Sequence, residues 1–186
     1  MESNALRQLF EQKGALIKGH FFRLSGRHTD WYVQCARLFE DSATGEAVGK
    51  ELAARSAQYQ PDAILAAAIG GLLPGYEVAR ALNKPLFYCE KRDGALILRR
   101  GFTITPGMKV LLVEDEVSTG QSVREMMEIV RALGGSVVGI ACLVDKSGGD
   151  IPSHVPLCAL VTLKAEHYQA DACPMCQQGL PLQNLR

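Results

Sequence analysis

The sequence predicts an α/β fold in which helices flank a central, mostly parallel sheet. Several short apolar runs, such as residues 63–69 and 109–113, lack polar alternation, as is typical of strands buried on both faces. Amphipathic helical segments lie between these runs. The chain has 186 residues, of which 47% are hydrophobic and 22% charged, enough to build one substantial core. We therefore expect a single domain over residues 1–186.

The first 43 residues differ from the rest. Leu6, Leu9 and Phe10 recur at helical spacing and predict a helix over residues 4–14. Two aromatic-rich segments, residues 19–24 and 31–35, flank a Ser-Gly-Arg turn and predict a hairpin of two strands. We expect residues 1–43, together with the C-terminal tail, to form a small hood on the main domain.

From residue 44 onward, helices and strands alternate. Predicted helices span residues 44–59, 72–82 and 122–133, and predicted strands span 63–69, 86–89, 109–113, 137–144 and 157–163. The segment between Glu90 and Met108 fits neither period and is rich in Lys and Arg. Long connections of this kind are usually functional loops; the alternative is a solvated basic surface loop.

Composition excludes several classes of protein. Twenty basic residues balance twenty acidic ones, which argues against a dedicated nucleic-acid binder. No apolar run approaches the roughly 20 residues of a membrane span, and no signal-peptide pattern is visible. Scattered cysteines in apolar contexts are typical of buried free thiols. We expect a cytoplasmic protein with no nucleic-acid or membrane partner.

Residues 110–122 are the most informative stretch, because an apolar strand runs into two acids, a small turn and a helix. Glu114 and Asp115 would emerge at the carboxyl edge of the sheet, where open α/β folds bind ligands. Backbone N–H groups of residues 117–122 would form a nest for a phosphate at a helix N-terminus. The acids would then face a sugar diol or a hydrated Mg²⁺. The motif predicts a phosphorylated sugar as ligand; the simpler alternative is an ordinary turn with solvated acids.

This arrangement resembles the phosphoribosyl pyrophosphate motif of the type I phosphoribosyltransferases, and the orotate phosphoribosyltransferases among them. The similarity runs in order along nearly the whole chain. Its segments are residues 21–37 (hood), 68–71 (Ala-Ile-Gly-Gly, pyrophosphate loop), 90–94 and 98–102 (catalytic loop), 144–149 (Val-Asp-Lys-Ser-Gly-Gly) and 173–176 (tail).

The resemblance implies a type I phosphoribosyltransferase fold with a small hood and a flexible basic loop, residues 90–102. It implies transfer of the phosphoribosyl group from phosphoribosyl pyrophosphate to orotate in pyrimidine biosynthesis, giving orotidine monophosphate and pyrophosphate. Mg²⁺ would be held mainly by pyrophosphate, ribose hydroxyls and water, so we expect no set of protein metal ligands. A homodimer is implied, in which the basic loop acts on the partner's site.

The resemblance also implies roles for individual residues. The catalytic set is Asp115, Glu114, Arg99 and Arg100. Contact with the base would come from Ser118, Lys146, Trp31 and Tyr32, although Trp31 and Tyr32 are also interpretable as packing residues. Phosphoribosyl pyrophosphate would be bound by Lys91, Arg92, Gly70, Gly71, Glu114, Asp115, Glu116, Val117, Ser118, Thr119, Gly120, Gln121 and Ser122.

Several positions depart from the family pattern, including Ser118 in place of a threonine and Lys91 in place of an arginine, and three others bear most on the ligand. Glu116 replaces an apolar residue and would add negative charge beside an anion site if it points inward. Gln121 replaces a glycine. Lys146 replaces an arginine, and an ammonium cannot grip a carboxylate bidentately as a guanidinium does. These departures keep two alternatives open: a sister phosphoribosyltransferase for another base, and a non-catalytic sensor of phosphoribosyl pyrophosphate.

Cys173 and Cys176 form a Cys-x-x-Cys pair in the tail. Two such cysteines supply half of a zinc site, and no second pair with suitable spacing is evident. Structural free thiols, a shared metal site and a disulfide all remain open. His20 and His28 are interpreted as hood or surface residues rather than general bases.

Overall fold

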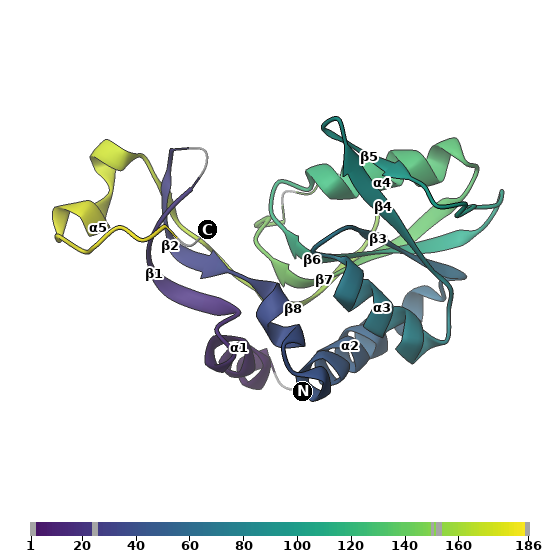
Figure 1. Cartoon of the computed structure of the whole chain (residues 1–186), viewed down its shortest axis with the longest axis horizontal. Coiled ribbons are helices and arrows are strands. Elements are labelled where there is room, and N and C mark those ends of the chain that lie inside the picture. Colours follow the sequence, from purple (N-terminus) through teal and green to yellow (C-terminus); the bar gives the residue numbers. More distant parts are fainter. Residues whose placement is uncertain (1–2, 24–25, 150, 152–153, 185–186) are drawn as a thin grey trace.

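The computed structural model describes residues 3–23, 26–149, 151 and 154–184. It contains a larger and a smaller sheet (Figure 1). The larger sheet has the order β5-β4-β3-β6-β7-β8, and its neighbours are parallel except for β4 and β5. Its strands are β3 (Ala63–Ala67), β4 (Leu86–Arg92), β5 (Ala95–Leu98), β6 (Lys109–Val117), β7 (Ser136–Asp145) and β8 (Leu157–Thr162). The predicted α/β architecture is confirmed.

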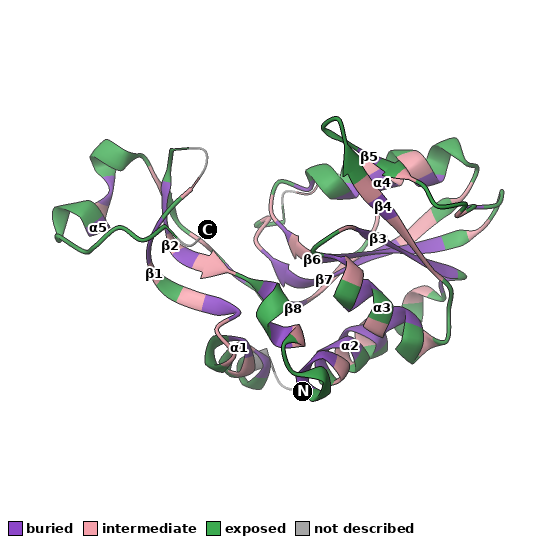
Figure 2. Ribbon diagram, viewed as in Figure 1, coloured by how far each residue is buried: buried purple, intermediate pink, exposed green. Residues whose placement is uncertain are grey.

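Helices cover both faces of this sheet because its central strand is apolar on both sides. On β6, Leu111 and Val113 join a core cluster with α2 (Ser42–Ser56) and α3 (Leu72–Leu82). Val110 and Leu112 join the opposite cluster with α4 (Gln121–Ala132). Successive strand side chains point to opposite faces, so one apolar run serves two cores. Figure 2 shows the resulting buried ribbon through β6 and β7.

The hood is built on the smaller sheet, which combines both ends of the chain. Strands β1 (Leu16–Phe22) and β2 (His28–Val33) pair antiparallel, and β9 (His167–Tyr168) pairs with β2. Helix α1 (Ser3–Gln12) precedes this hairpin, and the 3₁₀ segment η1 (Cys35–Phe39) leads from it into α2. Leu24 and Ser25, placed by the sequence at the end of a strand and in the turn, lie outside the described residues.

The C-terminal tail packs back on the hairpin. It forms the short segments η3 (Ala170–Ala172) and α5 (Pro174–Gln177) and then returns to β1. The Phe22 N–H donates to the Gln183 carbonyl over 3.0 Å, and the Gln183 N–H donates to the His20 carbonyl over 2.8 Å. Residues more than 150 positions apart therefore form one layer.

The first half of the segment that fitted neither period forms a hairpin, so the expectation of a connection without strands was wrong there, whereas residues 99–108 contain no helix or strand. β4 continues to Arg92 and pairs antiparallel with β5. Asp93 and Gly94 connect the strands with φ angles of 51° and 89°, as a two-residue type I′ turn requires. The Asp-Gly signal was present in the sequence, but the surrounding basic residues obscured the alternation.

Strand β6 is longer than predicted. It runs four residues beyond Val113, so the acidic residues lie within the strand, and Glu114 and Glu116 are in register with Cys142 and Val144 of β7. Parallel pairing with β7 continues because the side chains on either side of the acids are apolar and buried. The acids are therefore fixed by the sheet rather than carried on a loop.

Candidate active site

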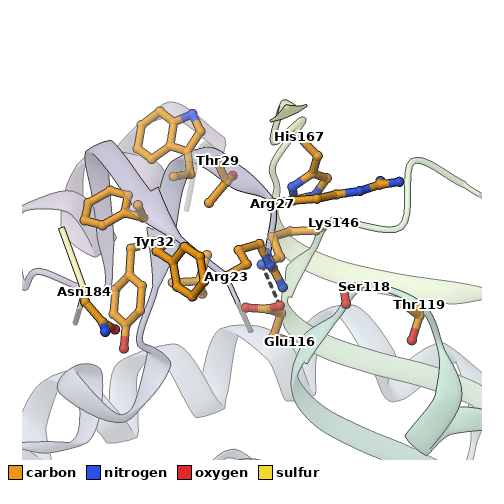
Figure 3. A pocket seen from close by; sticks show the side chains of 14 residues that line it. Arg23, Arg27, Thr29, Tyr32, Glu116, Ser118, Thr119, Lys146, His167 and Asn184 are labelled. Atoms are coloured by element: carbon orange, nitrogen blue, oxygen red, sulfur yellow. Dashed lines mark ion pairs between the residues drawn. The ribbon is translucent and has the colours of Figure 1, made fainter. Parts of the chain in front are cut away.

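A cavity of about 880 Å³ lies between the hood and the carboxyl ends of β6 and β7 (Figure 3). We call it the hood pocket. The sheet side contributes Glu116, Ser118, Thr119 and Lys146. The hood contributes Phe21, Phe22, Arg23, Arg27, Thr29, Trp31, Tyr32, Val33, His167 and Asn184.

The hood pocket is rich in cationic groups. Arg23 and Arg27 enter from either side of the hairpin turn, and Lys146 enters from the end of β7. Burial lowers the pKa of His167, and the positive charges of Arg23, Lys146 and Arg27 lower it further. Three cationic side chains, Arg23, Arg27 and Lys146, face a single acid, Glu116, among the described residues that line this pocket, a balance that favours an anionic ligand.

Lys146 and Glu116 form an ion pair inside this pocket, with 2.6 Å between Nζ and Oε1. The Lys146 side chain is only 4% exposed, and its backbone N–H donates to the Val117 carbonyl over 2.7 Å. Glu116 does lie on the pocket, but its charge is compensated. Two of the departures from the family pattern, Glu116 and Lys146, are thus in direct contact with each other.

A second cavity of about 160 Å³ lies at the start of α4, and we call it the turn pocket. Its wall consists of residues 117–123 with Glu114 and Glu116. Gly120 has φ of 70°, a left-handed conformation of the kind found where successive N–H groups form an anion-binding nest. The Arg124 guanidinium donates to the Thr119 carbonyl over 2.9 Å and stabilises this turn. The predicted phosphate nest therefore has a matching cavity at a helix N-terminus.

Two of the predicted nest side chains are engaged elsewhere. The Gln121 amide donates to Glu125 one helical turn on, over 2.9 Å. Ser122 forms a hydrogen bond with the Glu114 carboxyl group, which lowers the pKa of that acid slightly. Ser118 and Thr119 border both cavities and remain the hydroxyl groups best placed for a ligand.

Glu114 and Asp115 are both largely buried, which is costly for adjacent acids. Burial, and then the neighbouring Asp115, raise the pKa of Glu114 to about 8. Burial also raises the pKa of Asp115, even though its Oδ1 accepts a hydrogen bond from the Glu116 N–H over 2.8 Å. Sugar hydroxyls or a cation at this position would stabilise the ionised acids. The pair therefore fits a site for ribose hydroxyls and a hydrated Mg²⁺.

The predicted pyrophosphate loop lies directly against this acid pair. A Cβ atom on Gly70 would stand 2.5 Å from Asp115 Oδ2, and one on Gly71 would stand 2.9 Å from Glu114 Oε2. A side chain at either position would displace the acids, so the close approach requires glycine. The loop between β3 and α3, the acids and the turn pocket thus form one continuous surface.

The cations of the basic loop lie away from both cavities. Arg100 pairs with Glu90 over 2.6 Å and lies 5.8 Å from the Tyr88 ring centroid. Lys91, Arg92 and Arg99 are exposed. Within the part of the chain that the structure describes, none of these four residues lines the hood pocket or the turn pocket. The chain does not bring its own basic loop to its own acid pair.

Among the hood-pocket residues that could not be assigned from the sequence, three carry ionisable side chains: Arg23, Arg27 and His167. Both arginines flank the hairpin turn, and basic residues beside a turn that faces the sheet were the available signal. His167 belongs to a strand of two residues, which no periodicity reveals. Trp31 is part of a core cluster and also borders the hood pocket, so its packing role is observed and its contact with the base stays a prediction.

Comparison with known proteins is consistent with this geometry. The family model of the phosphoribosyl transferase domain matches residues 39–159. A protein from Caldanaerobacter subterraneus named orotate phosphoribosyltransferase is 42% identical over 98% of this chain and 96% of its own length. The chain belongs to the orotate phosphoribosyltransferase family. The resemblance noted in the sequence is confirmed.

Other members of the phosphoribosyltransferase family support the assignment. The protein named orotate phosphoribosyltransferase from Thermotoga maritima is 42% identical over 95% of this chain and 94% of its own length. A crystal structure of orotate phosphoribosyltransferase from Aeropyrum pernix aligns with a TM-score of 0.73 at 27% identity, over 86% of this chain and 94% of that one. An adenine phosphoribosyltransferase from Thermoanaerobacter pseudethanolicus shares the fold at 19% identity and a TM-score of 0.65. The fold alone therefore does not select the base.

No helix among the described residues is long and apolar enough to cross a membrane.

Proposed function

We propose that this protein transfers the phosphoribosyl group of phosphoribosyl pyrophosphate to orotate, forming orotidine monophosphate and pyrophosphate. A ring nitrogen of orotate loses its proton to solvent and bonds to C1 of the ribose, while the bond from C1 to the pyrophosphate oxygen breaks and its electron pair leaves with pyrophosphate. The observation that carries the proposal is the cationic hood pocket, which opens beside the acid pair and the turn pocket. Orotate carries a carboxylate, which neutral uracil and adenine lack, and Arg23 and Arg27 suit it.

Each part of phosphoribosyl pyrophosphate is assigned to one of the remaining surfaces of the site. The turn pocket accepts the 5′-phosphate through backbone N–H groups and the hydroxyls of Ser118 and Thr119. Glu114 and Asp115 accept hydrogen bonds from the ribose hydroxyls and stabilise the positive charge that develops on the sugar. The Gly70–Gly71 loop accepts the pyrophosphate beside them. Mg²⁺, when bound, offsets charge on the leaving pyrophosphate.

The exposed basic loop supports a homodimer in which Lys91, Arg92, Arg99 and Arg100 act on the partner's site. Their charges would cover the pyrophosphate as it leaves and exclude water. Arg100 is held by Glu90 in the isolated chain, so reaching a partner requires exchange of that pair for the pyrophosphate. We place the reaction in the cytoplasm, where its substrates would be available.

A base scan tests the proposal. The protein is incubated with phosphoribosyl pyrophosphate and Mg²⁺ plus orotate, uracil or adenine, and pyrophosphate release is followed. Of the three bases, only orotate is expected to cause pyrophosphate release. Asp115→Asn serves as the control for contaminating activity. Release with adenine or uracil instead would assign a sister activity. Tight binding of phosphoribosyl pyrophosphate with no release for any base would favour the non-catalytic sensor.

A further inference from the structure

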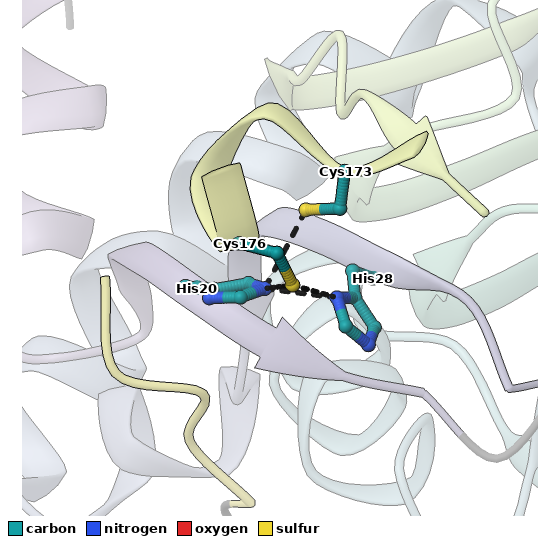
Figure 4. Close-up of side chains that lie close together, drawn as sticks. All are labelled: His20, His28, Cys173 and Cys176. Carbon is teal, nitrogen blue, oxygen red and sulfur yellow. Dashed lines mark hydrogen bonds between the residues drawn. The ribbon is translucent and has the colours of Figure 1, made fainter. Parts of the chain in front are cut away.

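Four side chains that the proposed reaction does not use gather in the hood (Figure 4). They are His20 on β1, His28 on β2, Cys173 immediately before α5, and Cys176 within it. One potential ligand atom from each lies within 4.8 Å of all the others. Three of the four residues are buried and Cys176 is exposed. The two cysteines have no second pair nearby in the sequence, because their neighbours in the cluster are histidines from the opposite end of the chain.

The spacing of the four atoms is close to a tetrahedron of metal ligands. Bonds of about 2.0–2.1 Å to nitrogen and about 2.3 Å to sulfur give edges of about 3.3 Å between nitrogens and about 3.6 Å between nitrogen and sulfur. Here His20 Nε2 and His28 Nδ1 are 2.9 Å apart. The sulfur-to-nitrogen distances are 3.5 Å from Cys173 and 3.6 Å from Cys176 to His20 Nε2, and 3.3 Å from Cys176 to His28 Nδ1. Small outward shifts would seat an ion at the centre.

The tautomer of His20 is fixed as a metal ligand requires. His20 Nδ1 lies 2.9 Å from the Leu180 carbonyl oxygen, which can only accept, so Nδ1 carries the proton. Nε2 of the neutral ring then presents its lone pair to the cluster. A backbone carbonyl that orients the far nitrogen of a histidine is the usual outer partner of a metal ligand.

Hydrogen bonding alone satisfies this cluster poorly. One lone pair on His20 Nε2 faces three groups within 3.6 Å, namely His28 Nδ1 and both sulfurs. It can accept well from only one of them, so hydrogen bonds cannot pair all of these contacts at once. A single cation bonds all four atoms at once.

We propose that His20, His28, Cys173 and Cys176 bind one Zn²⁺ ion as a closed structural site. Two imidazole nitrogens and two thiolates in tetrahedral array favour zinc over the hard cations Mg²⁺ and Ca²⁺. All four positions are filled by protein, so the site holds no water for catalysis. Binding releases the two thiol protons to solvent. The exposed Cys176 gives the ion a route of entry.

The ion would join the tail to the hairpin. In the tail, η3 and α5 are short segments with few buried side chains, Cys173 and Met175 among them, so little apolar burial holds them in place. His20 and His28 stand on either side of the hairpin turn that carries Arg23 and Arg27 into the hood pocket. If the proposed function holds, the ion also fixes the arginines that bind the base, although the metal site stands without it.

Metal content tests the proposal directly. The full-length protein, purified under reducing conditions and supplied with Zn²⁺, is expected to retain one zinc per chain after desalting. Cys176→Ser and His28→Asn should lower this value at least several-fold. Cys158→Ser and His154→Asn, which replace the same residue types outside the cluster, should leave it unchanged. A wild-type protein without zinc, or cluster variants that keep it, would overturn the proposal.

A second measurement covers variants that do not fold. The wild-type protein is reconstituted with Co²⁺, and its absorption spectrum is expected to show tetrahedral coordination with thiolate charge-transfer bands. A spectrum of octahedral Co²⁺ without such bands would refute the site. Thiol titration after denaturation without reductant completes the test: six free thiols after zinc removal agree with the site, whereas four would identify a Cys173–Cys176 disulfide instead. None of these readouts depends on catalytic activity, so failure of the metal site and failure of the proposed reaction are distinguishable.

Discussion

The variant Glu114→Gln separates the contribution of Glu114 to the reaction rate from its effect on the free energy of unfolding. Burial and the neighbouring Asp115 raise the pKa of Glu114 from 4.5 to about 8. The folded protein therefore keeps this proton at pH values where the unfolded chain has lost it. Stability falls as the pH rises between these two values, because unfolding then releases a proton.

The magnitude follows from the width of that window. Each pH unit within it costs about 1.4 kcal/mol per retained proton, so a rise from about pH 5 to about pH 7 costs roughly 2–3 kcal/mol. Glutamine has nearly the same shape, still accepts the Ser122 hydrogen bond and does not titrate. The stability advantage of Glu114→Gln over wild type is therefore expected to grow by that amount across the same interval, while the rate of pyrophosphate release falls.

Urea unfolding at the two pH values, at one protein concentration, measures the difference. Glu128→Gln is the matched control, because Glu128 is an exposed acid on α4 with a side chain 70% accessible and a single surface pair to Arg131. Its effect should be nearly independent of pH. An advantage of Glu114→Gln that is constant or shrinks with rising pH would refute the assignment of a buried, proton-retaining Glu114.

Asp115→Asn is expected to slow pyrophosphate release by about 10²–10³-fold, because it removes an oriented charge from the site. The free energy of unfolding should not fall, because the cost of burying that charge is removed as well. Activity within a few-fold of wild type would place Asp115 outside the site. Glu116→Gln should tighten orotate binding, because Lys146 keeps its charge and loses its anionic partner. The expected change in isothermal titration is about five-fold in affinity, or roughly 1 kcal/mol. Weaker binding would mean that Glu116 is needed to orient Lys146. When the Arg100→Ala and Asp115→Asn proteins are mixed, part of the activity should return, because a mixed dimer contains one site with both groups intact. No recovery after verified subunit exchange would mean that the basic loop acts on the site of its own chain.

The larger sheet was predictable from the sequence because local and tertiary preferences agree there. Apolar runs such as residues 109–113 are too hydrophobic for a surface strand, and the helices between them have one apolar face. The acid pair was also predictable, since polar residues at the carboxyl end of a buried strand face the ligand edge. The basic hairpin was missed although Asp93-Gly94 signals a turn, because alternation there involves few apolar residues.

The hood was only half predictable, because it is assembled from both ends of the chain. Nothing local to residues 19–35 indicates that β9 will pair with β2, or that Cys173 will meet His20 across 153 positions. Sequence spacing identifies metal sites whose ligands come from one segment, but it does not identify ligands that come together only through tertiary contacts. For the same reason, His167 could not be identified from the sequence as a residue of the hood pocket.

Glu116 and Lys146 each argue against an anionic base when considered alone, and their direct contact weakens that objection. Alone, Glu116 would place an uncompensated carboxylate in an anion pocket; with Lys146 at 2.6 Å the two charges offset each other. In the proposed reaction, Arg23 and Arg27 rather than residue 146 would bind the carboxylate of the base, because guanidinium groups can bind a carboxylate bidentately. Their position depends on the turn between β1 and β2, and that turn is bounded by the two histidines of the proposed zinc site. A base pocket that relies on hood arginines needs a rigid hood, and a metal ion joining the hairpin to the tail is a physical means of providing one.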